Sequence, residues 1–150
     1  MELSASQVRN LFLDEHTIIR DVLEEIEETL GEMTRRVPGG IGRLRSCLRT
    51  FQDAFLRHLS HEETVLRPLL ADVDAWGPVR VEAMDEEHRL QRRALTELSR
   101  LSLEEDVDGT VRRVEEFVRR LRADMDSEER HALSEEVLRD DIMVIDTFMG

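Results

Sequence analysis

The chain has 150 residues, of which 40% are hydrophobic and 37% are charged, and its net charge is −13. This length suits a single domain with a substantial core, and the acidic balance argues against a nucleic-acid partner, because phosphate contacts require a basic surface. The single cysteine excludes an intramolecular disulfide and a cysteine-built zinc site, and no apolar run approaches the roughly 18 residues of a membrane span.

Four segments repeat apolar residues every three or four positions, which predicts four helices. They cover about residues 5–33, 41–71, 79–103 and 109–133, with breaks at 34–40, 72–78 and 103–110. Long helices with short connections predict an all-α, up-down-up-down antiparallel four-helix bundle over about residues 5–133, in one domain spanning 1–150. We expect the C-terminal extension, about residues 134–150, to pack its Ile, Val and Phe across one end of the bundle; a homodimer contact is the alternative.

Each helix has an inward line that is apolar at its ends and polar in its middle. In the first helix this line is Val8, Phe12, His16, Ile19, Leu23, Ile26, Leu30 and Met33. The second continues from Phe51 and Phe55 through His58 and Glu62 to Val65 and Leu69, the third contains His88, and the fourth contains Asp124, Glu128 and His131. Counted from the predicted turns, these polar residues lie at one depth in the bundle.

Such a layer needs a compensating positive charge, because burying an unpaired carboxylate costs several kcal/mol or more. No arginine lies on the four inward lines, so a metal is the better candidate. Histidine nitrogen and carboxylate oxygen without thiolate suit iron or manganese, with zinc as a further option. Residues four apart share a helix face, so His58 and Glu62 can meet at one centre, and Glu62 and Glu128 could each bridge two metals.

These motifs resemble the hemerythrin-like, or HHE cation-binding, domain family over about residues 5–133. The similar stretches are "LDEHTII" with His16, "FLRHLSHEETVLRPLL" with His58 and Glu62, "MDEEHRL" with His88, and "RADMDSEERHAL" with Asp124 and Glu128. The resemblance implies a four-helix bundle that holds two non-haem iron ions joined by an oxo or hydroxo bridge. It also implies dioxygen or peroxide as the small-molecule ligand, and a role in oxygen or peroxide chemistry, iron handling, or iron or redox sensing.

The fourth helix departs from the family pattern, because Asp124 stands where the family has a histidine. Three carboxylates and a bridging hydroxide carry a charge of about −4, which balances two Fe(II) ions, and added anionic ligands stabilise ferric iron. We therefore expect a centre that oxidises readily and carries oxygen reversibly only poorly. Asp124 could bind directly or through water. His131 follows Glu128 at the Glu-x-x-His spacing of ferritin-like di-iron bundles, although a histidine packed or hydrogen-bonded near the bundle end is the plainer interpretation.

Neighbouring polar residues are expected to support the ligands. Glu63 and Glu129 are predicted to orient them or to face solvent. Gln91 is predicted either to hydrogen-bond within the polar layer or to be a polar residue at a helix boundary. Whether the protein is an enzyme stays open, with peroxide decomposition as the candidate reaction. The alternative function is a metal-responsive or metal-free helical bundle that acts as an interaction module. The beginning of the chain lacks the pattern of a signal peptide, so we expect a cytoplasmic protein.

Overall fold

The computed structural model describes residues 2–140, and within this range all regular structure is helical. The elements are α1 (Ala5–Thr34), α2 (Gly40–His61), the π-helical turn η1 (Glu62–Leu66), α3 (Arg67–Val73), α4 (Gly77–Ser99) and α5 (Val107–Arg130). The helices end and begin at or close to the three predicted breaks. None of the helices in the described range is long and apolar enough to cross a membrane.

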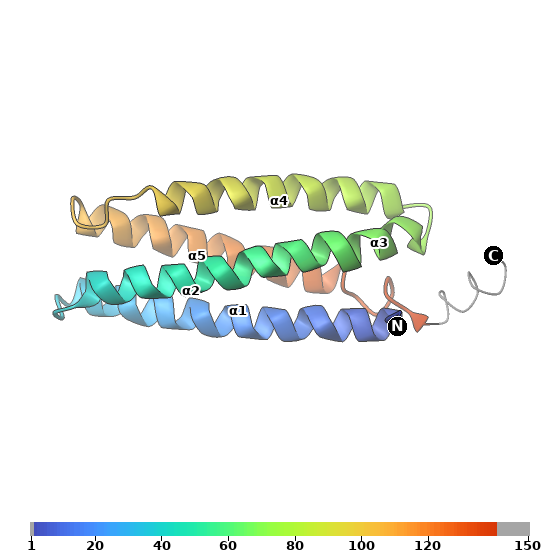
Figure 1. The fold of residues 1–150 in the computed structure, drawn as a ribbon, viewed down its shortest axis with the longest axis horizontal. Coiled ribbons are helices and arrows are strands. Elements are labelled where there is room, and N and C mark those ends of the chain that lie inside the picture. Colours follow the sequence, from blue (N-terminus) through green and yellow to red (C-terminus); the bar gives the residue numbers. More distant parts are fainter. Residues whose placement is uncertain (1, 141–150) are drawn as a thin grey trace.

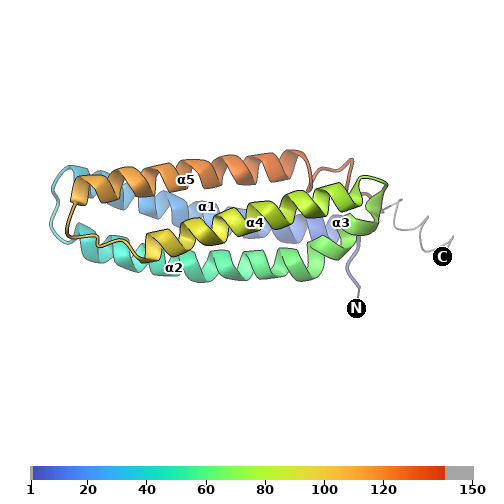
Figure 2. The same ribbon diagram turned by 90° about the horizontal axis from the view of Figure 1, so that it is seen from above.

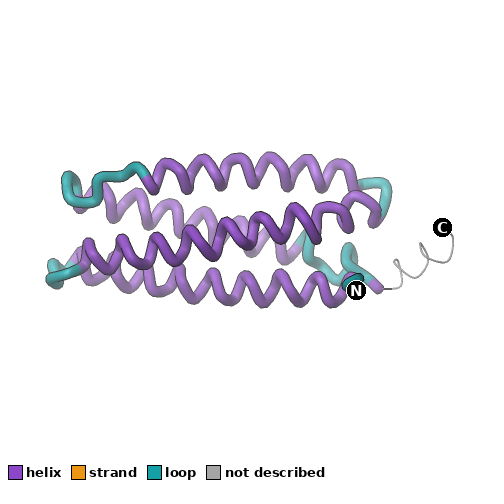
Figure 3. The backbone as a smooth tube through the Cα atoms, in the orientation of Figure 1, coloured by secondary structure: helices purple, strands orange, loops and turns teal. Residues whose placement is uncertain are grey.

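The helices lie side by side along a common direction, as a helical bundle does (Figures 1 and 2). Because α2, η1 and α3 follow one another without a gap, they form one continuous rod. The connections from α1 to α2 and from α4 to α5 lie at one end of the molecule, and the α3–α4 connection lies at the other (Figure 3). We refer to α1, the continuous α2–η1–α3 segment, α4 and α5 as the four rods. This arrangement lets one layer of residues from each rod face a common interior.

Local chemistry explains where the helices begin. Ser4 caps α1, since its hydroxyl accepts from the N–H of Gln7 at 3.2 Å and the Gln7 side chain accepts from the Ser4 N–H at 2.9 Å. Gly39, before α2, has φ of 83°, a left-handed conformation that favours glycine. At Gly77 a Cβ atom would overlap carbonyl oxygens at the end of α3, so glycine allows α4 to start directly against that helix.

The core consists of two apolar clusters, one on each side of a polar layer. The larger cluster lies toward the α1–α2 and α4–α5 connections and includes Ile19, Phe55, Leu95 and Met125. The smaller cluster lies toward the α3–α4 connection and includes Phe12, Leu66, Met84 and Leu133. His16 is buried on α1 between Phe12 of the smaller cluster and Ile19 of the larger one. The polar residues are therefore shielded along the bundle axis by packed side chains.

The buried face of the second rod differs from the prediction after Glu62. A regular helix would continue the inward line through Val65 and Leu69, yet these two are only half-buried, whereas Leu66 and Leu70 are fully buried. The cause is η1, in which the N–H of Arg67 bonds to the carbonyl five positions earlier and so adds one residue to the turn. The inward line therefore passes through Leu66 and Leu70 instead of Val65 and Leu69, and these two leucines belong to the smaller cluster.

The chain after α5 returns to the first helix. Leu133 and Leu138 are buried in the smaller cluster, and the Asp140 carboxylate accepts from the backbone N–H and the hydroxyl of Ser6, at 2.9 and 2.8 Å. The residues predicted to pack across the bundle end or to form a homodimer contact, Ile142, Val144, Ile145 and Phe148, lie outside the described range.

Candidate metal centre

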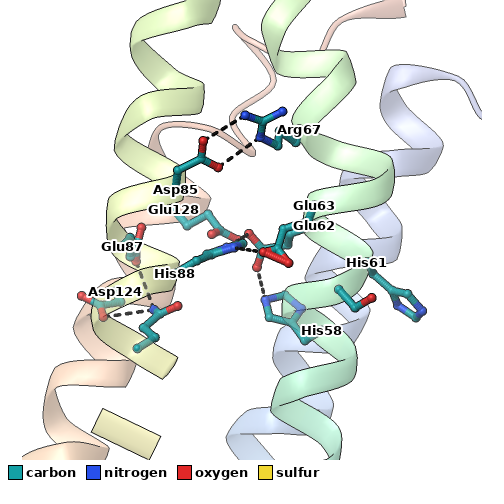
Figure 4. Close-up of polar contacts among 12 residues, drawn as sticks. His58, His61, Glu62, Glu63, Arg67, Asp85, Glu87, His88, Asp124 and Glu128 are labelled. Atoms are coloured by element: carbon teal, nitrogen blue, oxygen red, sulfur yellow. Dashed lines mark hydrogen bonds and ion pairs between the residues drawn. The ribbon is translucent and has the colours of Figure 1, made fainter. Parts of the chain in front are cut away.

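Five predicted ligands point into the polar layer from all four rods. His16 comes from α1, His58 from α2, Glu62 from η1, His88 from α4 and Glu128 from α5. Figure 4 shows the last four side chains directed toward one another between the ribbons. One nitrogen or oxygen from each of His16, His58, Glu62 and Glu128 lies within 4.8 Å of the others. We refer to these four residues as the central quartet.

Glu62 occupies the middle of this arrangement. Its Oε1 contacts Nε2 of His58, and its Oε2 lies 3.3 Å from Nε2 of His88. The Glu62 side chain is only 2% exposed, so its carboxylate lies between imidazoles of two different helices without access to solvent. Glu62 is also the first residue of η1, and π-helical turns are frequent at functional sites because they redirect side chains.

Two buried atoms of the quartet have no hydrogen-bond partner. Nε2 of His16 and Oε1 of Glu128 lie 3.1 Å apart, but their orientation does not satisfy a hydrogen bond. A buried polar atom without a partner costs about 1–3 kcal/mol. A cation that accepts a lone pair from each atom would remove this cost, so these residues fit a bound metal ion.

The Nδ1 atom of each inward imidazole, on the side away from the centre, contacts a carboxylate oxygen of another helix. The Nδ1···O contacts are His16 with Glu129 (2.6 Å), His58 with Glu15 (2.8 Å) and His88 with Glu63 (3.2 Å). An imidazole that donates its Nδ1–H to a carboxylate keeps the lone pair of Nε2 directed to the other side. This is the arrangement by which proteins orient metal-binding histidines, and it occurs here three times around one centre.

Arginines on the outside hold two of these carboxylates. Arg20 lies 2.6 Å from Glu129, and Arg92 reaches both oxygens of Glu63, at 2.8 and 2.7 Å. The prediction for Glu63 and Glu129 left open whether they orient ligands or face solvent, and their contacts with imidazoles correspond to the first option. Glu15 was missed, because its position beside His16 lies off the inward line of α1.

Charge is distributed unevenly over the quartet. Burial favours the neutral forms, but hydrogen bonds with Glu15 and Glu62 outweigh it and raise the pKa of His58 to about 10. Burial would also raise the pKa of Glu62, yet hydrogen bonds with His58 and His88 hold this pKa well below its usual range. Burial and the neighbouring Glu62 charge raise the pKa of Glu128. Without a metal, the centre therefore retains protons that a cation would replace.

A second polar group lies on the α4–α5 side of the quartet. The Gln91 side-chain amide donates to Asp124 at 3.2 Å and to Glu87 at 3.3 Å. Burial, followed by the charges of Glu128 and Asp124, raises the pKa of Glu87 to about 7. In Figure 4, Glu87 and Asp124 project into the space between α4 and α5, close to His88. Glu87 was also missed, because it stands next to the predicted ligand His88 and off the inward line of α4.

The two remaining predicted ligands lie at the margin of the centre. Asp124 is half-buried and is joined to Glu87 through Gln91, and it is not one of the quartet. His131 is exposed and follows the last residue of α5, where its backbone N–H bonds to the carbonyls of Ser127 and Glu128. The His131 side chain does not belong to the group of side chains that converge in the polar layer.

Comparison with known families agrees with this geometry. A family model described as "Hemerythrin HHE cation binding domain" matches residues 7–135. The matched stretch runs from the first turn of α1 to just beyond α5 and includes every predicted ligand. Searches of curated proteins and of solved structures gave no match.

Proposed function

Because the chain belongs to the hemerythrin HHE cation-binding domain family, we propose that it binds two non-haem iron ions inside its helical bundle. We further propose that the loaded protein acts in oxygen or peroxide chemistry or in iron or redox sensing. The observation that carries the proposal is the central quartet, in which four ligand atoms from three rods converge and two of the quartet's buried atoms lack hydrogen-bond partners.

The proposed ligands divide by role. His16, His58 and His88 would present Nε2 to the cations, while Glu62 and Glu128 would share their carboxylate oxygens between the two positions. Asp124 is the remaining proposed ligand. His131 would have to leave its exposed position to bind, so we expect a His131→Ala protein to retain both ions.

Bound iron would supply one-electron redox chemistry toward dioxygen or peroxide. The chain itself orients the donors and keeps out bulk water. The carboxylates of Glu15, Glu63 and Glu129 hold protons at the Nδ1 atoms, and the two apolar clusters close the layer from both sides. Phe12 and Phe55 also flank the His58 ring, with ring centroids 5.9 and 6.1 Å away.

Metal analysis of protein purified from iron-replete cells tests the proposal. We expect about two iron ions per chain and a near-ultraviolet absorption band from a bridged ferric pair. A Glu62→Ala variant should lose both ions, because it removes the carboxylate between the imidazoles. Glu115→Ala, an exposed change on α5, is the matched control. Wild-type protein that remains colourless and metal-free after anaerobic reconstitution with Fe(II) would contradict the proposal.

One contact favours sensing as a second candidate function. The N–H of Leu133 bonds to the carbonyl of the proposed ligand Glu128 at 2.9 Å, and Leu133 and Leu138 then pack against α1. A change at Glu128 would therefore be transmitted to residues 132–140. Hydrogen exchange of this segment should slow when metal is added, and unchanged exchange would remove the sensing candidate.

The proposal also covers the topology, the partners and the location of the protein. The positions of the three connections support the antiparallel up-down-up-down order. The net charge of −13 argues against nucleic-acid binding. A cytoplasmic location and a homodimer formed through the C-terminal residues stay predictions, to be tested by fractionation and by light scattering.

A further inference from the structure

The two sides of the metal centre have different ligand chemistry. On the α1–α2 side, the imidazoles of His16 and His58 face Glu62 and Glu128. On the α4–α5 side, His88 contributes the imidazole, and the other inward polar groups are the carboxylates of Glu87 and Asp124 with the amide of Gln91. The centre thus has an imidazole-rich half and an oxygen-rich half, with Glu62 and Glu128 between them.

The oxygen-rich half has more negative charge than its own contacts compensate. Glu87 and Asp124 share Gln91 as a hydrogen-bond donor, and Gln91 is neutral. The electrostatic neighbours of Glu87 include Glu128, Asp124 and Glu62, against the imidazole of His88, whose side chain is only 4% exposed. Carboxylates gathered in a partly buried layer repel one another unless a cation lies between them.

An independent observation indicates that the layer accommodates a cation. The His16 side chain is 1% exposed, and its Nε2 lies 3.1 Å from Oε1 of Glu128, but neither buried atom has a hydrogen-bond partner. Glu128 also interacts electrostatically with Glu87. Glu128 therefore lies between the two halves: it is close to the unpartnered Nε2 of His16 on one side and interacts with the charge of Glu87 on the other.

We propose that Glu87 is a ligand of the second cation, together with His88 and Asp124, and that this oxygen-rich position takes Mn(II) when Fe(II) occupies the imidazole-rich position. The inference rests on the proposed function, since it assumes that the centre binds cations. Its chemical basis is ligand preference, because carboxylate and carbonyl oxygens suit manganese, whereas imidazole suits iron. The chain would then hold a mixed pair of ions when both metals are supplied.

Anaerobic loading with two equivalents each of Fe(II) and Mn(II), followed by removal of unbound metal, tests this inference. We expect metal analysis to give one ion of each kind per chain, and the electron paramagnetic resonance signal of free Mn(II) to decrease on binding. In Glu87→Ala, Mn(II) should bind more than about tenfold more weakly, since even the loss of an outer partner of a metal ligand costs 10–100-fold. Asp124→His should shift the second position toward iron.

Controls separate a ligand role from a structural one. Glu82→Ala removes an exposed glutamate from the same helix and should leave Mn(II) binding unchanged. Glu87→Gln preserves the shape and one oxygen, and should bind Mn(II) with intermediate affinity while its far-ultraviolet circular dichroism matches the wild type. Two iron ions in wild-type protein loaded with both metals, or wild-type Mn(II) affinity in Glu87→Ala, would overturn the inference alone. Wild-type protein that binds neither ion would overturn the proposed function as well.

Discussion

The raised pKa of Glu87 makes a stability prediction for the metal-free protein. In the unfolded chain this carboxyl ionises near its ordinary value of 4.5, whereas in the folded protein burial and neighbouring carboxylates raise its pKa to about 7. A group whose pKa is raised by folding contributes stability at low pH and loses it as the pH rises through the folded value. Glu87→Gln cannot ionise, so the variant should gain stability relative to wild type between pH 5 and pH 8.

The magnitude follows from the two pKa values. At about 1.4 kcal/mol per pKa unit, the change from 4.5 to about 7 corresponds to about 3 kcal/mol for a fully buried group. The Glu87 side chain is only half-buried, and solvent screens part of its interaction with the other carboxylates. We therefore expect Glu87→Gln to gain about 1–2 kcal/mol of unfolding free energy over wild type on going from pH 5 to pH 8.

Urea denaturation of chelator-treated protein, followed by circular dichroism, measures this difference. The control is Glu82→Gln, on an exposed face of the same helix, which should differ from wild type by the same amount at both pH values. A Glu87→Gln variant whose stability relative to wild type does not change with pH would refute the reasoning, because Glu87 would then ionise as an exposed carboxyl does.

Three further predictions concern the ligand supports, the fold and the redox behaviour. Glu15→Gln should weaken metal binding by about 10–100-fold in a chelator competition, because it weakens the hold on an inward imidazole; Asp14→Asn, an exposed neighbour, should not. Leu70→Ala should cost about 2–5 kcal/mol in chemical denaturation and Leu69→Ala clearly less, whereas a regular helix through η1 would give the reverse order. Protein loaded with Fe(II) should be oxidised by air without releasing oxygen on evacuation, and reversible release at 25 °C would contradict the role assigned to Asp124.

Periodicity in the sequence was sufficient to predict the helices and most of the inward faces. All eight residues of the line predicted for the first helix, from Val8 to Met33, are buried. The polar interruptions at His16, His58 and His88 are buried as well. Helical spacing is a local property, since residues three and four apart share a face whatever the rest of the chain does. The same property predicts a polar layer without knowledge of the contacts between helices.

Two features could not be predicted from apolar spacing. The π turn moved the buried line of the second rod from Leu69 to Leu70, and a hydrogen-bond pattern of this kind has no signature in apolar spacing. Glu15 lies next to one histidine in the chain but contacts a different one, His58, on the neighbouring helix.

The oxygen-rich half depends in the same way on tertiary structure. Glu87 and Asp124 come from different helices and meet only through Gln91. The sequence alone determined most of the residues that face inward, because the inward face of a regular helix depends on the turn of that helix alone. Only the tertiary structure decided which carboxylate meets which imidazole, because those distances depend on how the rods are rotated and placed against one another.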